Sequence, residues 1–468
     1  MAPPLALRVL ETCQVSPPPG SVAEASLPLT FLEIYWLYTP PVQRLFFYRL
    51  PPSTSSTSSF IDSVLPDLKS SLSLALHPFY PLAGKIRRSP GSRDEDFQYE
   101  LQYADGGSVS FTVAEYEADF HDLCGRHARN LAKLQPLIPK LASSDDGGGD
   151  GVMPVMALQA TVFPGSGVVV GVSVHHSACD GSSSMHFMAS WASAFRSGGL
   201  APVVPPPPIF DKSLCSNPHG LYSIYGDFIR RLRIIYQSRE APDDTANVAA
   251  DDVMLATFIL NQQQIKMLKE LVLAKSAERE TKPFHISTVV VVYSYVWTCL
   301  TRARGMDGEE TSHLVFAADC RERMNPPLPV GYFGSCILPC FVEEKAARDL
   351  TEVDSGFLTA CEATGRAIER FKDRGLKDAA GMPERLMSIL SKKPMSVAGS
   401  PKLKVYDTDF GWGRPEKVEV ISISSSGAIS LAENRGEEAG VEIGLVGSKS
   451  ELDAFGACFF DGLKALLG

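Results

Sequence analysis

A run of mainly β-branched residues that ends at two histidines is the feature that most restricts the fold of this chain. Residues 168–174 (Val-Val-Val-Gly-Val-Ser-Val) form an apolar segment of strand length, and His175 and His176 follow directly. After a short turn, residues 182–195 carry apolar side chains at a helical spacing. A buried strand followed at once by an amphipathic helix is typical of an α/β protein.

Other segments indicate the same mixture of helices and strands. The apolar residues of 288–300 lie on one stripe and predict a buried helix. Residues 354–371 predict an amphipathic helix, and residues 452–467 predict a terminal helix. Residues 419–432 alternate between apolar and polar side chains, which predicts a hairpin with its turn at 425–427.

The length of the chain predicts two domains. It has 468 residues, of which 44% are hydrophobic, so two cores of roughly 200 residues each are expected. Four consecutive prolines at 205–208 predict a stiff connector. We therefore predict an N-terminal domain over 1–200, a crossover over 201–250 and a C-terminal domain over 251–468. Polar or small-residue stretches predict surface loops at 51–59, 143–151 and 240–252.

Charge and cysteine content restrict the partners. The formal net charge is −10, and there is no stripe of Lys and Arg to bind a nucleic acid. No apolar stretch reaches the roughly 18 residues of a membrane span, and the N-terminal apolar run is too short for a secretory signal. The ten cysteines lack the neighbours of a zinc site. We expect a cytoplasmic protein with free thiols, small-molecule partners and no bound metal.

The paired histidines suggest one structural and one chemical residue. Successive side chains of a strand point to opposite faces, so His175 and His176 cannot both enter one site. His176 lies where the strand gives way to a loop, and its ordinary pKa near 6.5 suits proton abstraction. Asp180, four residues later, can orient or pair with nearby groups. The alternatives are a satisfied buried histidine, or a metal pair that lacks a third ligand.

A second motif, Asp409-Phe410-Gly411-Trp412-Gly413, combines a carboxylate, two aromatic residues and two glycines. Gly411 and Gly413 permit a tight backbone path. A carboxylate at such a place needs a partner. The indole N–H of Trp412 either donates to a developing oxyanion or simply packs. The alternative for the whole motif is a domain joint without a chemical part.

In this order and at this separation, the two motifs resemble the HxxxD and DFGWG signatures of the plant BAHD family of acyl-CoA-dependent acyltransferases. Tyr80-Pro81-Leu82-Ala83-Gly84-Lys85 and the segments 29–37, 287–297 and 326–334 resemble further blocks of that family in the same order. The resemblance implies two pseudo-symmetric chloramphenicol-acetyltransferase-like domains with a channel between them. It also implies a monomer that uses acyl-CoA as co-substrate and holds no permanent cofactor.

The resemblance assigns roles to particular residues. It implies that His176 is the general base, names Asp409 as a second catalytic candidate that acts mainly through a domain joint, and gives Asp180 a structural role. It predicts that Asp409 pairs with Arg321, or failing that with Arg323, and that Gly411, Trp412 and Gly413 shape the site. The candidates for contact with CoA are Ser287, Thr288, Arg44 and Ser400, with Lys266, Lys269 and Lys402 as nearby cations. Ser287 and Thr288 are alternatively helix N-caps.

Segments 40–48 and 406–413 are similar to the anthocyanin and flavonoid glycoside branch of the family. This branch implies transfer of a malonyl or hydroxycinnamoyl group to a hydroxyl of a flavonoid, anthocyanin or phenolic glucoside. Two positions depart from it: Ser335 stands where Asn is usual, and Ser182 stands where malonyl-using members carry Lys or Arg. The alternatives are N-acylation of amines and an inactive small-molecule-binding homologue.

Two other enzyme classes fit less well. Condensation domains share a His-His-x-x-x-Asp-Gly motif and two domains but lack DFGWG. A serine hydrolase needs Gly-x-Ser-x-Gly, and Gly165-Ser166-Gly167 lacks that spacing.

Overall fold

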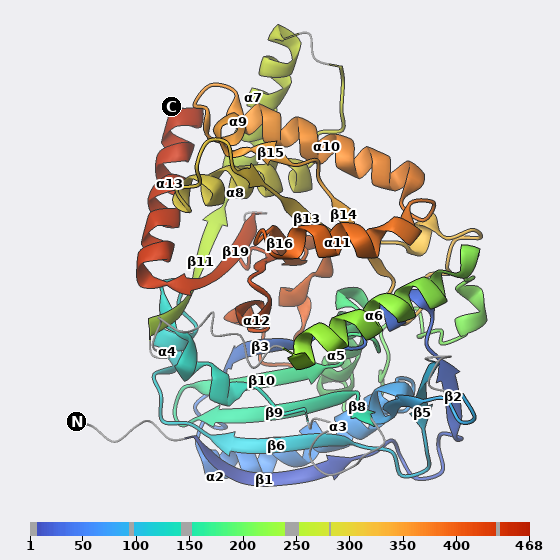
Figure 1. Ribbon diagram of the computed structural model, residues 1–468. Helices are drawn as coiled ribbons and strands as arrows, with labels where there is room; N and C mark the ends of the chain where they lie inside the picture. Colours follow the sequence, from blue (N-terminus) through green and yellow to red (C-terminus); the bar gives the residue numbers. More distant parts are fainter. Residues whose placement is uncertain (1–6, 93–97, 142–151, 239–251, 280–281, 437–439) are drawn as a thin grey trace.

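The computed structural model of the protein describes residues 7–92, 98–141, 152–238, 252–279, 282–436 and 440–468. Two large sheets lie one above the other, and helices cover them (Figure 1). The mixed α/β class predicted from the sequence is confirmed. The loops predicted at 143–151 and 240–252 fall outside the described residues, except for residue 252.

Among the described residues, the lower sheet of Figure 1 contains six strands. In spatial order they are β1 (Arg8–Val15), β6 (Val109–Glu115), β9 (Met156–Phe163), β10 (Gly167–Val174), β3 (Val42–Arg49) and β17 (Lys417–Val420). β10 is antiparallel to both β9 and β3. All residues of β9 and β10 are buried, which confirms the strand predicted at 168–174.

Helices α3 (Leu65–Leu76) and α5 (Gly181–Arg196) pack against each other beside this sheet. α5 directly follows β10, as predicted from the spacing of 182–195. The loop predicted at 51–59 ends early, because the Ser56 side chain caps the short helix α2 (Thr57–Ser59) that leads toward α3. A smaller sheet contains β2 (Ala25–Pro28), β5 (Tyr99–Tyr103), β4 (Lys85–Arg88) and β8 (Met153–Pro154).

The upper sheet of Figure 1 has seven described strands. In spatial order they are β14 (Ile337–Phe341), β13 (Leu314–Asp319), β16 (Met395–Gly399), β18 (Ile429–Glu433), β19 (Val441–Ser448), β11 (Val253–Leu260) and β7 (Arg129–Asn130). The helices predicted in this half are confirmed as α8 (Thr288–Ala303), α10 (Gly356–Arg374) and α13 (Lys449–Leu467). α8 packs between the other two, which explains why both its faces are apolar.

Each large sheet contains one strand from the other half of the chain. β17 pairs with β3 in the lower sheet, and β7 pairs with β11 in the upper sheet. The hairpin predicted at 419–432 is therefore wrong, because β17 and β18 belong to different sheets and α12 (Ile423–Ser426) lies between them. The domain limits at 200 and 250 stay a prediction. β7 and β17 each pair with a strand from the other side of these limits.

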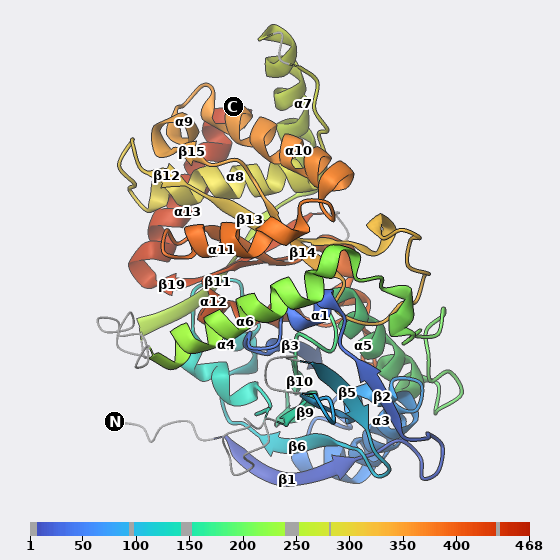
Figure 2. The ribbon, with the colours of Figure 1, turned by 45° about the vertical axis from the view of Figure 1, so that its right-hand side comes forward.

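Helix α6 (Leu221–Ser238) runs between the two halves (Figure 2). It packs on α1 (Phe31–Ile34) of the N-terminal half and on the 3-10 helix η10 (Ala379–Gly381) of the C-terminal half. The hydroxyl of Tyr225 donates to the carbonyl of Ala379 at 3.0 Å. The crossover segment is therefore part of the contact between the two halves of the chain.

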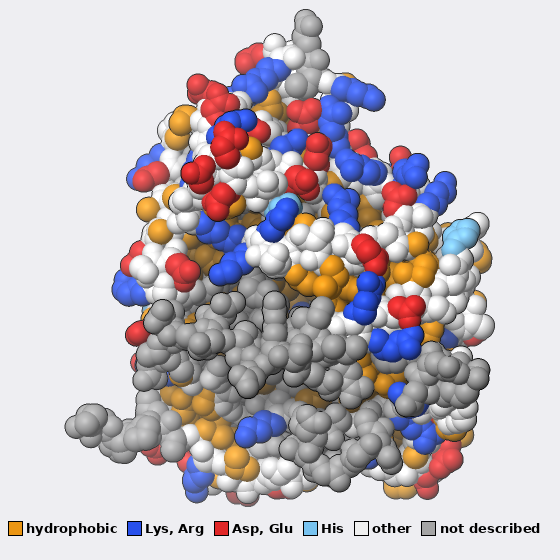
Figure 3. All heavy atoms as spheres, viewed as in Figure 1, with side chains coloured by type: hydrophobic (Ala, Val, Ile, Leu, Met, Phe, Trp, Pro, Cys, Tyr) orange, Lys and Arg blue, Asp and Glu red, His pale blue; other side chains and the backbone are white. Residues whose placement is uncertain are grey.

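The face of the molecule in Figure 3 carries Lys and Arg side chains interspersed with Asp and Glu, mainly over the C-terminal half. In the ranges that the structure describes, no helix is both long enough and apolar enough to cross a lipid bilayer.

Candidate active site

His175 is the structural member of the histidine pair. Its side chain is buried, and its Nδ1 accepts a hydrogen bond from the backbone N–H of Ser177 at 3.2 Å. Burial and the neighbouring His176 lower the pKa of His175 to about 4, although a hydrogen bond to the backbone of Leu37 opposes the shift. The ring is therefore neutral at physiological pH and serves the packing of the loop.

His176 is the presented member of the pair. It lies two residues beyond β10, is only partly buried, and stacks on Trp36 with 4.2 Å between the ring centroids. Its Nδ1 lies 3.4 Å from Oγ of Ser335. Burial lowers the pKa of His176, although a backbone hydrogen bond and the charge of Asp180 oppose the shift. A neutral ring with its proton on the Nδ1 side leaves the Nε2 lone pair to accept a proton.

Both carboxylate oxygens of Asp180 accept structural hydrogen bonds. Its Oδ1 accepts from the backbone N–H of Ser183 at 3.0 Å and so caps α5. Its Oδ2 accepts from Cys336 N–H at 3.0 Å and from Nη1 of Arg321 at 2.8 Å. Burial alone would raise the pKa of Asp180, but Arg321 and the N–H donors lower it overall. The carboxylate is a fixed anion rather than a base.

Arg321 ties the second half of the chain to the histidine motif. Its Nη2 donates to Oγ of Ser183 at 3.0 Å and to the carbonyl of Gly334 at 3.1 Å. The backbone N–H of Gly334 also donates to Oγ of Ser183 at 3.1 Å. These bonds hold the backbone next to Ser335 against the start of α5. The pairing of Asp180 with Arg321 therefore places Ser335 beside His176.

The partner predicted for Asp409 is wrong. Arg321 pairs with Asp180, and its second ion pair is with Asp319 at 3.3 Å. Arg323, the fallback, donates to the backbone carbonyl of Asp319 instead. The sequence offers two motif carboxylates for one arginine, and only the packing of α5 on the segment around 334 decides between them.

Asp409 holds a turn of its own. Its Oδ1 accepts from Gly411 N–H at 2.7 Å and from Gly413 N–H at 2.9 Å. Both glycines have positive φ angles, 92° and 88°, which explains why glycine is needed at each. Nη1 of Arg196, at the end of α5, donates to the backbone carbonyl of Asp409 at 3.0 Å. These contacts favour the domain-joint alternative, and a direct part in the chemistry stays a prediction.

The aromatic residues of the second motif pack against side chains of α5 and β3. Phe410 is fully buried, with its ring centroid 5.0 Å from that of Trp191. Trp412 stacks on Phe410 and lies 5.5 Å from Tyr48 and 5.3 Å from Phe195. Helix α5 has 16 residues and is about 24 Å long. The two motifs thus lie against opposite ends of one helix, and the packing alternative for Trp412 agrees with these contacts.

Several CoA candidates meet in one hollow of the C-terminal half. Lys266, Lys269, Thr288 and Pro401 line a hollow of about 710 Å³. Nζ of Lys269 donates to Oγ1 of Thr288 at 2.9 Å. Lys266 is exposed, so its ammonium faces solvent at the rim. The hollow carries positive charge at a place large enough for a phosphorylated ligand.

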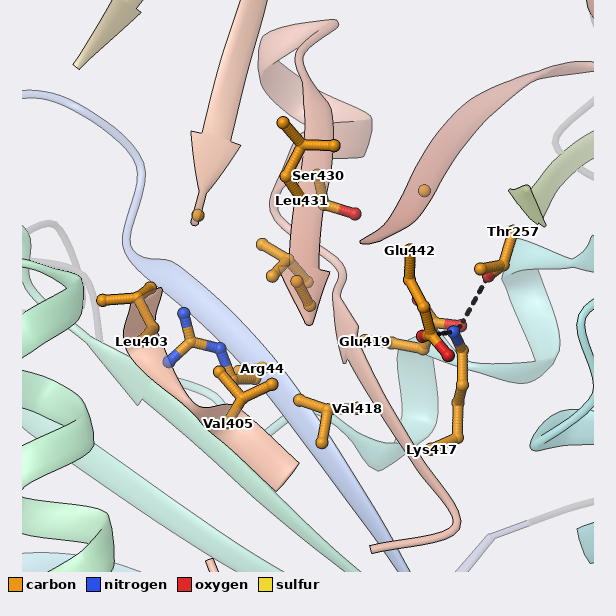
Figure 4. Close-up of a pocket in the computed structure, with 14 residues that line it drawn as sticks. Arg44, Thr257, Leu403, Val405, Lys417, Val418, Glu419, Ser430, Leu431 and Glu442 are labelled. Atoms are coloured by element: carbon orange, nitrogen blue, oxygen red, sulfur yellow. Dashed lines mark hydrogen bonds and ion pairs between the residues drawn. The ribbon is translucent and has the colours of Figure 1, made fainter. Parts of the chain in front are cut away.

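Other CoA candidates have structural contacts. Ser287 accepts from the N–H of Val290 at 3.3 Å, so it is the N-cap of α8, as the alternative stated. Oγ of Ser400 accepts from the N–H of Lys402 at 3.2 Å, next to the rim residue Pro401. Arg44 lies away from this hollow, in a separate cavity between the sheets (Figure 4).

Trp36 and Ser335 are site residues that the sequence did not single out for the site. Trp36 belongs to an apolar block near the N-terminus, where it looks like a core residue. Ser335 carries a visible signal, its departure from the usual asparagine, but only the fold shows that it faces His176.

All ten cysteines are free thiols. No three His, Cys, Asp or Glu side chains in the described ranges gather as a metal site.

The sequence matches the model of the Transferase family over residues 10–459. It is 34% identical to malonyl-coenzyme A:anthocyanin 3-O-glucoside-6''-O-malonyltransferase of Dahlia pinnata, with 98% of each chain covered. It is 35% identical to phenolic glucoside malonyltransferase 2 of Arabidopsis thaliana, covering 98% of this chain and 100% of that one. It is 34% identical to coumaroyl-CoA:anthocyanidin 3-O-glucoside-6''-O-coumaroyltransferase 1 of Arabidopsis thaliana, covering 98% and 97%. The fold is similar to that of vinorine synthase, with a TM-score of 0.67, 22% identity and 96% of each chain covered.

Proposed function

The chain belongs to the Transferase family, the BAHD acyltransferases, and on that premise we propose that it transfers a malonyl or hydroxycinnamoyl group from CoA to a sugar hydroxyl of a phenolic or anthocyanin glucoside. It is an acyl-CoA-dependent acyltransferase. The observation that carries the proposal is the neutral, partly exposed His176, stacked on Trp36 within a chain similar over its full length to glucoside acyltransferases.

His176 acts as the general base. Its Nε2 takes the proton of the acceptor hydroxyl while the hydroxyl oxygen attacks the thioester carbonyl carbon. The new C–O bond forms and the carbonyl oxygen becomes an oxyanion. When the C–S bond breaks, the imidazolium returns the proton to the sulfur of CoA. A neutral imidazole is required for the first step, and its lowered pKa provides this form at pH 7.

The remaining motif residues position this base. Ser335 and Trp36 restrict the ring, because one holds its Nδ1 side and the other its face. Asp180 and Arg321 hold the backbone around Ser335. Asp409, with Gly411 and Gly413, holds the joint at the far end of α5 and acts through the fold rather than on the substrate.

The hollow around Lys266, Lys269 and Thr288 binds the phosphates of CoA. Ammonium groups attract phosphate oxygens, and a hydroxyl beside them adds a donor. Ser400 and Lys402 lie next to the rim at Pro401 and complete the same edge. The free thiols of all ten cysteines support a cytoplasmic location. We expect a monomer, which the elution volume in size-exclusion chromatography checks.

Release of free CoA thiol tests the function. Purified protein receives malonyl-, acetyl-, coumaroyl- or feruloyl-CoA with a pool of flavonoid glucosides, phenolic glucosides and polyamines, beside the His176→Ala variant. Acceptor-dependent release that disappears in the variant supports the proposal, and mass spectrometry of the product names the acceptor. Acylation of the polyamines alone would replace O-acylation by N-acylation. Binding without release would indicate an inactive homologue.

A further inference from the structure

The indole of Trp36 lies face to face with the imidazole of His176. The ring centroids are 4.2 Å apart, and the two ring planes differ by only 12°. The face of an indole ring is negative, and it attracts a cation that lies within about 6 Å of the ring centroid. An imidazole that takes up a proton in this position is therefore attracted to the indole more strongly than the neutral ring is.

His176 carries a positive charge during the reaction proposed for it. Its Nε2 takes the proton of the acceptor hydroxyl when the C–O bond forms, and the imidazolium keeps this proton until the C–S bond breaks and the sulfur receives it. Burial disfavours the charged form, since it lowers the pKa of His176. A neighbour that stabilises the imidazolium therefore lowers the barrier of the step in which it forms.

The carboxylate nearest in sequence to His176 is already paired. Asp180 opposes the lowering of the pKa of His176, but one of its oxygens lies 2.8 Å from the guanidinium of Arg321, which offsets its charge. His175 is neutral, because burial lowers its pKa to about 4. In the described ranges, no carboxylate lies within ion-pair distance of His176. The face of Trp36 is thus in direct contact with a ring that has no ion-pair partner.

Backbone contacts hold Trp36 in this orientation. Its N–H donates to the carbonyl of Glu33 at 3.1 Å, and its carbonyl accepts from the hydroxyl of Thr39 at 2.8 Å. Tyr35 packs edge-on against the indole, with 5.0 Å between the ring centroids. The indole N–H has no hydrogen-bond partner among the described residues, and it lies in the ring plane, so it does not point at the stacked His176. The imidazole therefore contacts the π face.

A buried ion pair ties the segment of Trp36 to the segment of Ser335. Oε1 of Glu33 pairs with Nζ of Lys212 at 2.5 Å, and both side chains are buried. The same Nζ donates to the carbonyl of Phe333 at 3.2 Å, two residues before Ser335. The pair is neutral as a whole, so it fixes the position of the indole without adding a net charge to the site.

We propose that Trp36 is a positioning residue whose π face stabilises the imidazolium form of His176 and so promotes deprotonation of the acceptor hydroxyl. The inference rests on the proposed function, in which His176 is the general base. Among aromatic side chains, Trp attracts a cation most strongly and Phe less so, whereas an aliphatic side chain has no π face. Phenylalanine at position 36 should therefore replace the indole in part, and leucine should not.

The test compares Trp36→Leu and Trp36→Phe with the wild type. Leucine keeps an apolar cover over the imidazole but removes the attraction to its protonated form, so the pKa of His176 should fall. We expect Trp36→Leu to lower kcat about 2- to 30-fold and this pKa by about 0.4 to 1.5 pH units, with Trp36→Phe in between. The pH dependence of kcat/KM and an NMR titration of histidine Cε1 measure the pKa. The His176 signal is assigned by its absence in His176→Ala.

Phe187→Leu is the matched control. Phe187 is also a buried aromatic residue of the N-terminal half, but it packs on Phe79 rather than on a site residue. This substitution should leave the pKa of His176 in place. An unchanged or raised pKa in Trp36→Leu would mean that the indole only covers the imidazole, and it would overturn the proposal even where kcat falls.

A second measurement does not depend on the Trp36→Leu variant folding. Fluorination of indole withdraws electron density from its face and changes its shape little. The chain has four tryptophans, and in the described ranges Trp36 is the one that stacks on a histidine. Protein made with fluorinated tryptophan throughout should therefore show a lower pKa at His176. An unchanged pKa overturns this inference alone, whereas full turnover in His176→Ala overturns the proposed function.

Discussion

The carboxylates of the two motifs lie in contrasting surroundings. Asp180 is 2% exposed and bonds to groups from both halves of the chain, including the guanidinium of Arg321. The Asp409 side chain is 31% exposed and bonds to two N–H groups of its own turn, with Arg196 at 3.7 Å. The first carboxylate therefore joins distant segments of the chain, and the second shapes one short segment.

The two carboxylates therefore represent two structural roles of a motif residue that does not touch the substrate: pairing with a buried charge, and shaping a local turn. Removing Asp180 leaves the largely buried Arg321 with only the half-exposed Asp319 as an ion-pair partner and leaves the N–H of Cys336 without its acceptor, and such losses are large. Removing Asp409 frees two N–H groups near solvent, and such losses are modest. His176 lies near Asp180, whereas Asp409 lies at the far end of α5. Substitutions of the two carboxylates should therefore differ in their effects on stability and on the pKa of His176.

The largest effect is expected for His176→Ala. Loss of a positioned base should lower kcat by about 10²- to 10⁴-fold, because the acceptor hydroxyl keeps its proton. The midpoint of thermal unfolding should stay within about 2 °C of the wild type, since the ring is only partly buried. Steady-state kinetics and a melting curve check both. A variant with full turnover would exclude His176 as the base.

Asp180→Ala should have the next largest effect, this time on stability. We expect about 3–5 kcal/mol less free energy of unfolding, because Arg321 loses its buried partner and keeps only the ion pair with Asp319. Urea unfolding followed by fluorescence measures it. Asp119→Ala is the matched control: Asp119 also caps a helix but is exposed, so a loss of about 0.5–2 kcal/mol is expected there. Equal losses of unfolding free energy at the two positions would mean that the buried ion pair of Asp180 contributes no more than an exposed helix cap.

At Asp409 the two substitutions should differ from each other. Asp409→Ala loses the acceptor for Gly411 and Gly413 and should cost about 1–2 kcal/mol of stability. Asp409→Asn keeps an oxygen there and should retain most of the turnover. If Asp409→Asn instead loses as much rate as His176→Ala while it stays folded, the direct catalytic role is correct and the domain-joint account fails.

The smallest effect should appear in the pH dependence. Burial lowers the pKa of His176, so kcat/KM should rise with pH and level off, with its midpoint below the ordinary histidine value near 6.5. The negative charge of Asp180 raises the pKa of His176, so Asp180→Asn should move the midpoint lower still. Asp409→Asn should leave it in place. A midpoint that moves with Asp409 would show that the second carboxylate is closer than the packing indicates.

The sequence predicted the parts of this protein that depend on local pattern. Periodicity was sufficient for α5, α8, α10 and α13, because the apolar face of each helix is written within its own residues. The buried strand β10 was predicted for the same reason. The prediction of an acyl-CoA-dependent transferase is confirmed by the family and by full-length relatives.

Pairings over long distances were not accessible from the sequence. The residues of β17 alternate as well as those of any hairpin, and nothing local says that they pair with β3. Arg321 had two candidate carboxylates, and the choice depended on three-dimensional packing. Arg44 was named as a candidate contact with CoA, but the structure buries it away from the hollow around Lys266 and Lys269.

The exchanged strand β17 has a consequence for how the protein is made. Strand β3, near residue 45, has β17, near residue 418, as its neighbour. At about 5–20 residues per second, a ribosome needs on the order of 20–70 s to deliver the second after the first. During that interval the nascent N-terminal sheet has an open apolar edge at β3, which is where strands of other chains can add. Truncated chains that end before residue 417 should therefore be more prone to aggregate than the complete protein.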